Sequence, residues 1–129
     1  FRILPGETSD DVLKHLEKVV ADKRVKIFPI EEGKYEPAPV SPSNVPGFKN
    51  IFTALRQIYP EAVVAPTMML SSSDSKHFAV VTKNIYRFAP IIVNSGDMTR
   101  IHGLNERTSI EDFKRGIGFY YQLIKISNN

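Results

Sequence analysis

The sequence contains no cysteine and no tryptophan, and it has no long apolar run. Without cysteine there is no disulfide framework and no thiolate metal site. No apolar run approaches the roughly 20 residues that a membrane-spanning helix needs, so we expect no membrane span. Charge of one sign is not in large excess either: 17 Lys and Arg face 14 Asp and Glu, a formal charge of +3. Because no basic stripe with interleaved aromatic residues appears, we expect no nucleic-acid partner.

The composition is that of an ordinary globular protein. The chain has 129 residues, of which 42% are hydrophobic and 24% charged, so a packed core is expected. The sequence carries no signal peptide. Its first residue, Phe1, lies within an apolar run, and we therefore expect the chain to be cut from a larger protein. The compartment stays unknown on this evidence.

Apolar side chains at helical spacing predict four helices. The predicted helices cover 9–22, 47–59, a short turn from Asp74, and a segment that follows Thr108. Two of them have a capping pair in the sequence. Thr8 with Asp11 is expected to cap the first helix, and Thr108 with Glu111 the last.

Four further apolar segments are predicted to be strands, at 1–4, 24–30, 62–70 and 85–93. The stretch 31–46 holds four prolines and is the best linker candidate, with a boundary near Pro46. This order predicts an α/β protein. Residues 1–46 would form a strand–helix–strand unit, and residues 47–129 the edge of an α/β sheet.

Three places in the sequence are candidates for chemistry. The first is the loop Ser71–His77, which includes Ser72, Ser73, Asp74 and Ser75 and follows a predicted buried strand. Its hydroxyls and backbone N–H groups could bind an anion, helped by the N-terminus of a helix that begins at Asp74. The residues alone favour a solvated serine-rich loop with an N-cap, and anion binding is the alternative.

The other two places are the run 100–107 and Arg2. A neutral imidazole such as that of His102 is a common zinc ligand, and Asn105 or Glu106 could orient it by hydrogen bonding. A single loop histidine is more often an ordinary hydrogen-bonded residue. Arg2, next to a Pro-Gly turn, could clamp a carboxylate, but by its residue type alone it is a surface arginine.

The order of four segments resembles a known family. The segments are FRILPGET (1–8), SDSKHF (73–78), NIYRFAP (84–90) and RIHGLNER (100–107). Together they resemble the di-zinc aminoacylase/carboxypeptidase metallopeptidases. Within that family they are most similar to the branch of carboxypeptidase S (the Gly-Xaa carboxypeptidase) and N-fatty-acyl-amino acid synthase/hydrolase. The likeness covers nearly the whole chain and places it in the C-terminal portion of such a protein.

The resemblance implies a two-domain zinc-exopeptidase fold with a ferredoxin-like lid. Residues 1–46 would be the second half of the lid, or dimerisation domain, with its linker, and residues 47–129 the C-terminal part of the catalytic domain. His102 would be the last zinc ligand, and Asn105 and Glu106 would hydrogen-bond behind it. The substrate carboxylate would be bound by lid and loop residues: Arg2, Ser72, Ser73, Asp74 and Ser75.

The implied activity is hydrolysis of an amide bond next to a free carboxylate, on an N-acyl amino acid or a peptide. The general base and the other ligands of the two zinc ions would lie upstream of Phe1, so we expect the isolated chain to be inactive. Because its two partial domains would expose apolar surfaces that missing partners normally cover, we also expect a homo-oligomer. Serines at 71–73 and Lys76 stand where the family usually has glycines, a threonine and an arginine, which leaves the substrate preference open. The alternatives are a non-catalytic dimerisation module, or a dipeptidase or deacetylase of the same fold.

Overall fold

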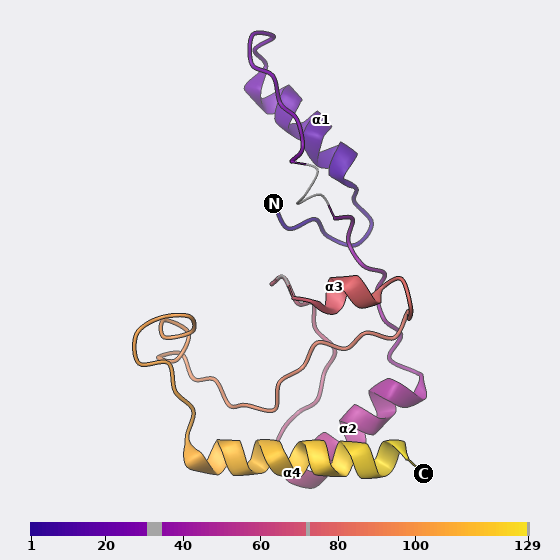
Figure 1. Cartoon of the computed structure of the whole chain (residues 1–129), viewed down its shortest axis with the longest axis vertical. Coiled ribbons are helices and arrows are strands. Elements are labelled where there is room, and N and C mark those ends of the chain that lie inside the picture. Colours follow the sequence, from indigo (N-terminus) through magenta and orange to yellow (C-terminus); the bar gives the residue numbers. More distant parts are fainter. Residues whose placement is uncertain (31–34, 72, 129) are drawn as a thin grey trace. The chain divides into compact units, whose positions relative to one another are not determined.

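The computed structural model describes residues 1–30, 35–71 and 73–128. In chain order its helices are α1 (Ser9–Val20), α2 (Pro46–Ile58), α3 (Ser75–Phe78) and α4 (Ile110–Ser127) (Figure 1). The chain divides into two compact units. Unit 1 comprises 1–41 and 69–85, and unit 2 comprises 42–68 and 86–129. All four predicted helices are confirmed, with ends that differ by one or two residues from the prediction.

The N-terminal cap of α1 is the predicted pair of Thr8 and Asp11. The Thr8 hydroxyl accepts the Asp11 N–H at 3.2 Å, and the Asp11 carboxylate accepts the Thr8 N–H at 3.0 Å. The Thr8 hydroxyl also donates to the Asp11 carboxylate at 2.6 Å. This hydrogen bond, together with the one from the Thr8 N–H, lowers the pKa of the Asp11 carboxyl, since both favour its charged form. The helix ends two residues earlier than predicted because Ala21 takes a left-handed conformation (φ 50°) and donates to the Glu17 carbonyl.

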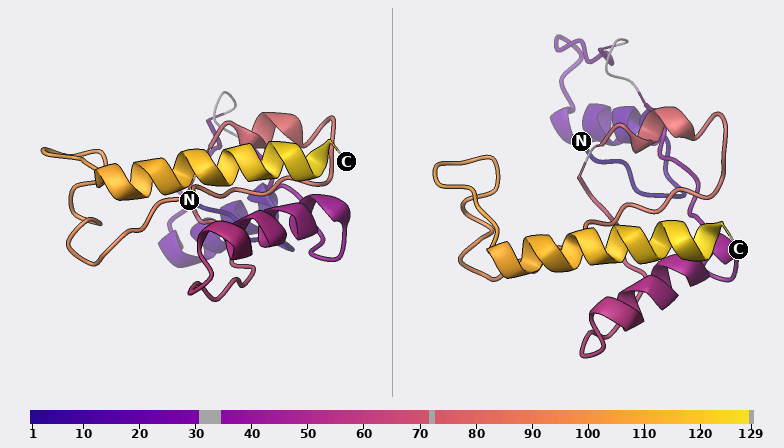
Figure 2. Two further views of the ribbon diagram at one scale, coloured as in Figure 1. Left: turned by 90° about the horizontal axis from the view of Figure 1, so that it is seen from below. Right: turned by 60° about the horizontal axis from the view of Figure 1, so that its bottom comes forward.

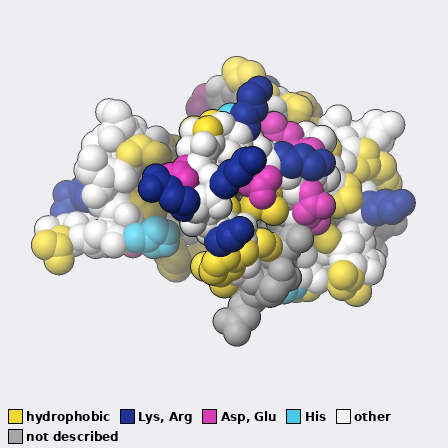
Figure 3. Space-filling model, turned by 90° about the horizontal axis from the view of Figure 1, so that it is seen from above, with side chains coloured by type: hydrophobic (Ala, Val, Ile, Leu, Met, Phe, Trp, Pro, Cys, Tyr) yellow, Lys and Arg dark blue, Asp and Glu magenta, His cyan; other side chains and the backbone are white. Residues whose placement is uncertain are grey.

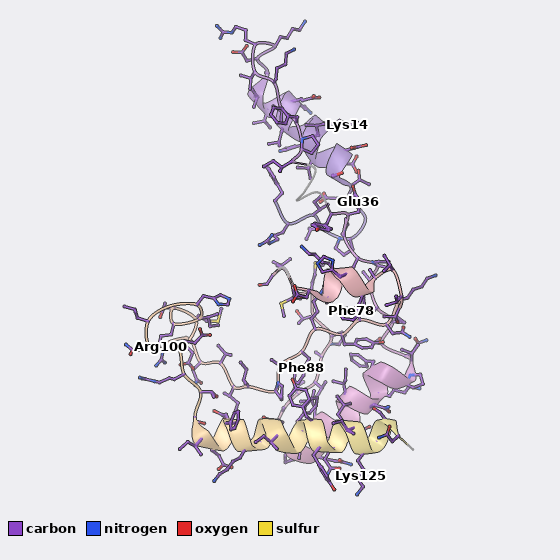
Figure 4. The ribbon with its side chains drawn as sticks, in the orientation of Figure 1. Lys14, Glu36, Phe78, Phe88, Arg100 and Lys125 are labelled. Carbon is purple, nitrogen blue, oxygen red and sulfur yellow. The ribbon has the colours of Figure 1, made fainter. Side chains whose placement is uncertain are left out.

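The core of unit 2 is the contact between α2 and α4 (Figure 2). The buried apolar side chains of the described residues are Ala54, Leu55, Tyr59 and Phe119. Phe119 is the largest fully buried side chain among them, with 1% of its surface exposed. Its ring lies 5.3 Å from that of Phe88, which points toward α4 in Figure 4 and ties the segment before the 94–107 loop to the core.

Polar contacts surround Tyr59 at the end of α2. Its hydroxyl donates to the Pro90 carbonyl at 2.9 Å, and the guanidinium of Arg115 from α4 lies 4.0 Å over its ring. Burial raises the pKa of the Tyr59 hydroxyl, so the group stays a neutral donor. Arg115 also donates to the Ile58 carbonyl at 3.0 Å and pairs with Glu61. These contacts therefore link the end of α2 to the middle of α4 and to Pro90.

None of the predicted strands forms within the described residues. The segments 1–4, 24–30, 62–70 and 85–93 have no strand ladder, and their apolar side chains are largely exposed, as in Val63 at 94%. A strand needs hydrogen bonds from a neighbouring strand, and an unpaired one gains no such ladder. The predicted α/β class is thus not seen in the described part of the chain, which is helical.

The charged side chains are of mixed sign. Figure 3 shows Lys and Arg side chains beside Asp and Glu, with hydrophobic side chains exposed at several places on the same face. Within the described residues, no helix is both long and apolar enough to cross a membrane.

The cap of α4 differs from the prediction by one residue. Ser109, with extended backbone (φ −69°, ψ 152°), accepts the Asp112 N–H at 3.0 Å, and its hydroxyl donates to the Asp112 carboxylate at 2.6 Å. The predicted pair of Thr108 and Glu111 is therefore wrong. Both hydroxyl residues have an acidic residue three positions later, and the backbone conformation selects Ser109.

Two alanine substitutions separate these capping assignments. Ser109→Ala should destabilise unit 2 by about 1 kcal/mol, because an Ncap side chain satisfies an otherwise unpaired helix N–H. Thr108→Ala should leave stability nearly unchanged. The measurement is the urea midpoint of the helical circular-dichroism signal for the two variants. A larger loss in Thr108→Ala would contradict the assignment.

Candidate functional site

The serine loop of unit 1 precedes the short helix α3. The Ser73 and Ser75 hydroxyls hydrogen-bond to each other at 2.7 Å, and Ser72 lies outside the described residues. Asp74 is the N-cap residue of α3, but its side chain makes no capping hydrogen bond. Because α3 has only four residues, its dipole is small, and the predicted help from a helix N-terminus is weaker than the sequence suggested. The described part of the loop therefore offers an anion the hydroxyls of an exposed Ser73 and a half-buried Ser75.

An aromatic contact holds the residues that follow this loop. The Lys76 ammonium lies 3.9 Å from the centre of the Tyr35 ring, and the His77 ring meets the same ring edge-on at 5.9 Å. A cation over a ring face is attracted by the negative charge of that face. Lys76 is thus held beside the serine loop, while the His77 ring packs against Tyr35.

Arg2 belongs to the same unit as the serine loop. Its side chain is exposed, and no hydrogen bond or ion pair joins it to another described residue. The guanidinium is therefore available to an anion from solvent. Its assignment as a carboxylate-binding residue stays a prediction.

His102 lies in the exposed loop 94–107 of unit 2. It has a left-handed backbone (φ 60°), as does Asn105 (φ 61°). This conformation costs a non-glycine residue roughly 1–2 kcal/mol, so the surrounding loop must hold it. The His102 N–H donates to the Glu106 carboxylate at 3.1 Å. Glu106 thus binds the backbone of His102, a different contact from the imidazole hydrogen bond that the sequence suggested.

Asp97, which was not among the candidate residues predicted from the sequence, organises the start of this loop. Its carboxylate accepts the Asn94 N–H at 2.9 Å and pairs with the Arg100 guanidinium. The Asn94 hydrogen bond, with the positive charges of Arg100 and Arg107, lowers the pKa of the Asp97 carboxyl. The signal that could have revealed it is the spacing Asn-x-x-Asp, because an aspartate three residues after the start of a turn can accept a backbone N–H.

The described residues do not form a complete metal site. No group of three or more His, Asp or Glu side chains among them is arranged to hold an ion. A catalytic zinc ion takes about three protein ligands, and one imidazole does not hold it tightly. Taken alone, the residues present therefore do not fit the two zinc ions that the resemblance implies.

Comparison with known proteins confirms the resemblance. The chain is 40% identical to the probable carboxypeptidase S-like 2 of Dictyostelium discoideum over 97% of its own length and 24% of that protein. It is 35% identical to the N-fatty-acyl-amino acid synthase/hydrolase PM20D1 of Xenopus tropicalis, over 99% of this chain and 25% of the relative. The human PM20D1 is also 35% identical, over 97% of this chain and 25% of the relative.

The chain spans about a quarter of the length of the curated relatives that it matches. No family model matches the sequence. No solved structure matches it either. The similarity, at 35–40% identity, extends over nearly all of the 129 residues. The chain belongs to the family of carboxypeptidase S and N-fatty-acyl-amino acid synthase/hydrolase.

Proposed function

We propose that this chain is the C-terminal portion of a zinc-dependent amidohydrolase that cleaves an amide bond next to a free carboxylate. The observation that carries the proposal is similarity over 97–99% of the chain to proteins named as carboxypeptidases and N-fatty-acyl-amino acid synthase/hydrolases. The two names share a substrate chemistry: each describes an amide or peptide bond whose nitrogen belongs to an amino acid. The free carboxylate of that amino acid is the group common to both.

The proposed fold is the α/β zinc-exopeptidase, with 1–46 in the lid and 47–129 in the catalytic domain. The exposed apolar segments, such as 62–70 and 85–93, would be strands of a sheet whose other strands come from the rest of the protein. This accounts for two features of these segments: their residues are apolar and suited to strands, and their backbone pairs with no other strand among the described residues. Homo-oligomer formation through the lid stays part of the proposal.

His102 is the residue of this chain that would contribute to the metal centre. A bound zinc ion supplies a water of lowered pKa and polarises the scissile carbonyl. The left-handed backbone of His102 and its hydrogen bond to Glu106 would fix the direction of the imidazole. The remaining ligands and the general base would come from the rest of the protein.

The substrate carboxylate would be bound by residues of unit 1. The Arg2 guanidinium pairs with no other residue that the structure describes, the Ser73 and Ser75 hydroxyls can donate hydrogen bonds, and Lys76 adds a positive charge beside them. Arginine suits carboxylates because its planar fork makes two parallel hydrogen bonds. Fixing the carboxylate orients the neighbouring amide, which lowers the entropic part of the barrier.

The substrate proposal is tested with a panel of paired compounds. The full-length enzyme should hydrolyse N-acyl amino acids or carboxyl-terminal peptide bonds, and the methyl ester of each substrate should lose at least about 10-fold in kcat/KM, since a hydrogen bond to a charged group contributes about 1.5–3 kcal/mol. Equal rates on acids and esters would exclude carboxylate recognition. If the enzyme hydrolyses none of the compounds in the panel, the result would favour the alternative of a non-catalytic dimerisation module.

The role of His102 is tested by replacing it in the full-length enzyme. His102→Ala should release the zinc ion that His102 would bind and lower kcat by more than about 100-fold, because loss of a partner behind a ligand alone costs 10- to 100-fold. His15→Ala is the matched control, since His15 is an exposed histidine of α1 and should tolerate the change. Metal analysis by mass spectrometry and steady-state kinetics provide the two readouts. Retained zinc and activity in His102→Ala would remove His102 from the metal centre.

The chain alone should neither hold zinc tightly nor hydrolyse substrate. Its described residues supply one candidate ligand where about three are needed. Titration calorimetry of the 129-residue chain with zinc should therefore show no submicromolar, stoichiometric binding. A tight one-to-one isotherm would overturn this part of the proposal.

A further inference from the structure

The loop that carries His102 is a run of linked turns. The Asp97 N–H donates to the Asn94 carbonyl at 2.9 Å, and the Arg100 N–H donates to the Asp97 carbonyl at 2.9 Å. The Gly103 N–H then donates to the Arg100 carbonyl at 2.8 Å. His102 sits inside the third turn, just before Gly103. The direction of its side chain is thus set by backbone hydrogen bonds that begin at Asn94.

One carboxylate fastens this run from the side. Asp97 accepts the Asn94 N–H with one oxygen and pairs with the Arg100 guanidinium through the other, so it joins the first turn to the start of the third. The positive charge of Arg107 also acts on the Asp97 carboxyl, which brings the far end of the loop near the same group. The peptide that holds His102 therefore lies between two residues, Arg100 and Arg107, that both interact with Asp97.

Burial distinguishes Asp97 and Arg100 from the rest of the loop. Their side chains are 25% and 28% exposed, and every other residue from 91 to 111 is exposed. A charged pair that is partly shielded from water is screened less than a pair on the open surface. The Asp97–Arg100 pair is thus the partly buried contact of a loop whose other residues are exposed (Figure 4).

We propose that Asp97 is a positioning residue for His102, which it serves by fastening the 94–107 loop through Asn94 and Arg100. The inference rests on the proposed role of His102 as a metal ligand and adds a residue to it. Asp97 does not touch the metal or the substrate. It keeps the left-handed conformation of His102 populated, so the ligand is in place before the ion binds. Loss of Asp97 should weaken metal affinity and kcat while the KM for the substrate carboxylate changes little.

The test compares two charge-removing substitutions in the full-length enzyme. Asp97→Asn keeps the shape of the side chain but weakens both of its contacts. Glu111→Gln removes the same charge from an exposed residue in the first turn of α4 that pairs with no other described residue. Asp97→Asn should lower zinc affinity, measured by competition with a chelator, by about 10- to 100-fold. It should lower kcat by a similar factor, and Glu111→Gln should change either quantity less than twofold.

Two further measurements separate positioning from a general loss of structure. Arg100→Gln removes the ion pair but keeps the Asn94 hydrogen bond, so its zinc affinity should fall between that of Asp97→Asn and that of the unaltered enzyme. In the metal-free protein, the amides of His102 and Gly103 should exchange with deuterium faster in Asp97→Asn, while the amides of α2 and α4 keep their rates. Faster exchange throughout unit 2 would indicate unfolding and overturn the proposal.

The outcomes distinguish this inference from the function on which it rests. If His102→Ala retains zinc and activity, the assignment of His102 fails and the role of Asp97 fails with it. If His102→Ala loses both but Asp97→Asn behaves like Glu111→Gln, only the positioning role fails. A rise in KM with unchanged kcat in Asp97→Asn would also overturn it, since that pattern belongs to substrate binding.

Discussion

The packing of Phe119 against α2 is the contact on which the order of unit 2 depends. Phe119 buries its ring beside Ala54 and Leu55, and Phe88 covers it from the preceding segment. Few other side chains of the described residues are fully enclosed, so a large share of the burial free energy comes from this one place. The Tyr59 hydroxyl adds a hydrogen bond that prevents the buried Pro90 carbonyl from being left unpaired. Both contacts hold the chain where it leaves the core and enters the His102 loop.

Beyond that contact the chain depends on local hydrogen bonds. The loop 94–107 has no apolar core of its own, and its order comes from linked turns and the carboxylates of Asp97 and Glu106. This division would suit the proposed role of the loop in carrying a metal ligand. A packed helix pair gives a fixed base, and a small number of polar contacts set one side chain without burying it away from a metal or a substrate.

The helices could be predicted from the sequence because their signals are local. The Thr8–Asp11 pair and the apolar stripe of 47–59 each lie within a few residues of the structure that they specify. The four predicted strands, in contrast, do not form among the described residues, because a strand is stabilised by partners that its own residues do not identify. The same limit applies to the site. Residue type drew attention to His102, whereas the part played by Asp97 follows from contacts with Asn94 and Arg100 that appear only once the turns are formed.

Helix α4 carries more apolar surface than its contact with α2 uses. Phe119 and Gly116 face the core, while a second stripe at helical spacing stays exposed, with Phe113 at 62%. The members of this stripe are Ile110, Phe113, Ile117, Tyr121 and Ile124. A helix with two apolar faces is typical of a layer packed on both sides rather than of a surface helix. In the proposed α/β domain the second face of α4 would be covered by the part of the protein that completes the sheet. In the proposed fold the exposed stripe and the unpaired apolar segments would have the same cause, since each would be one side of a contact completed by the rest of the protein.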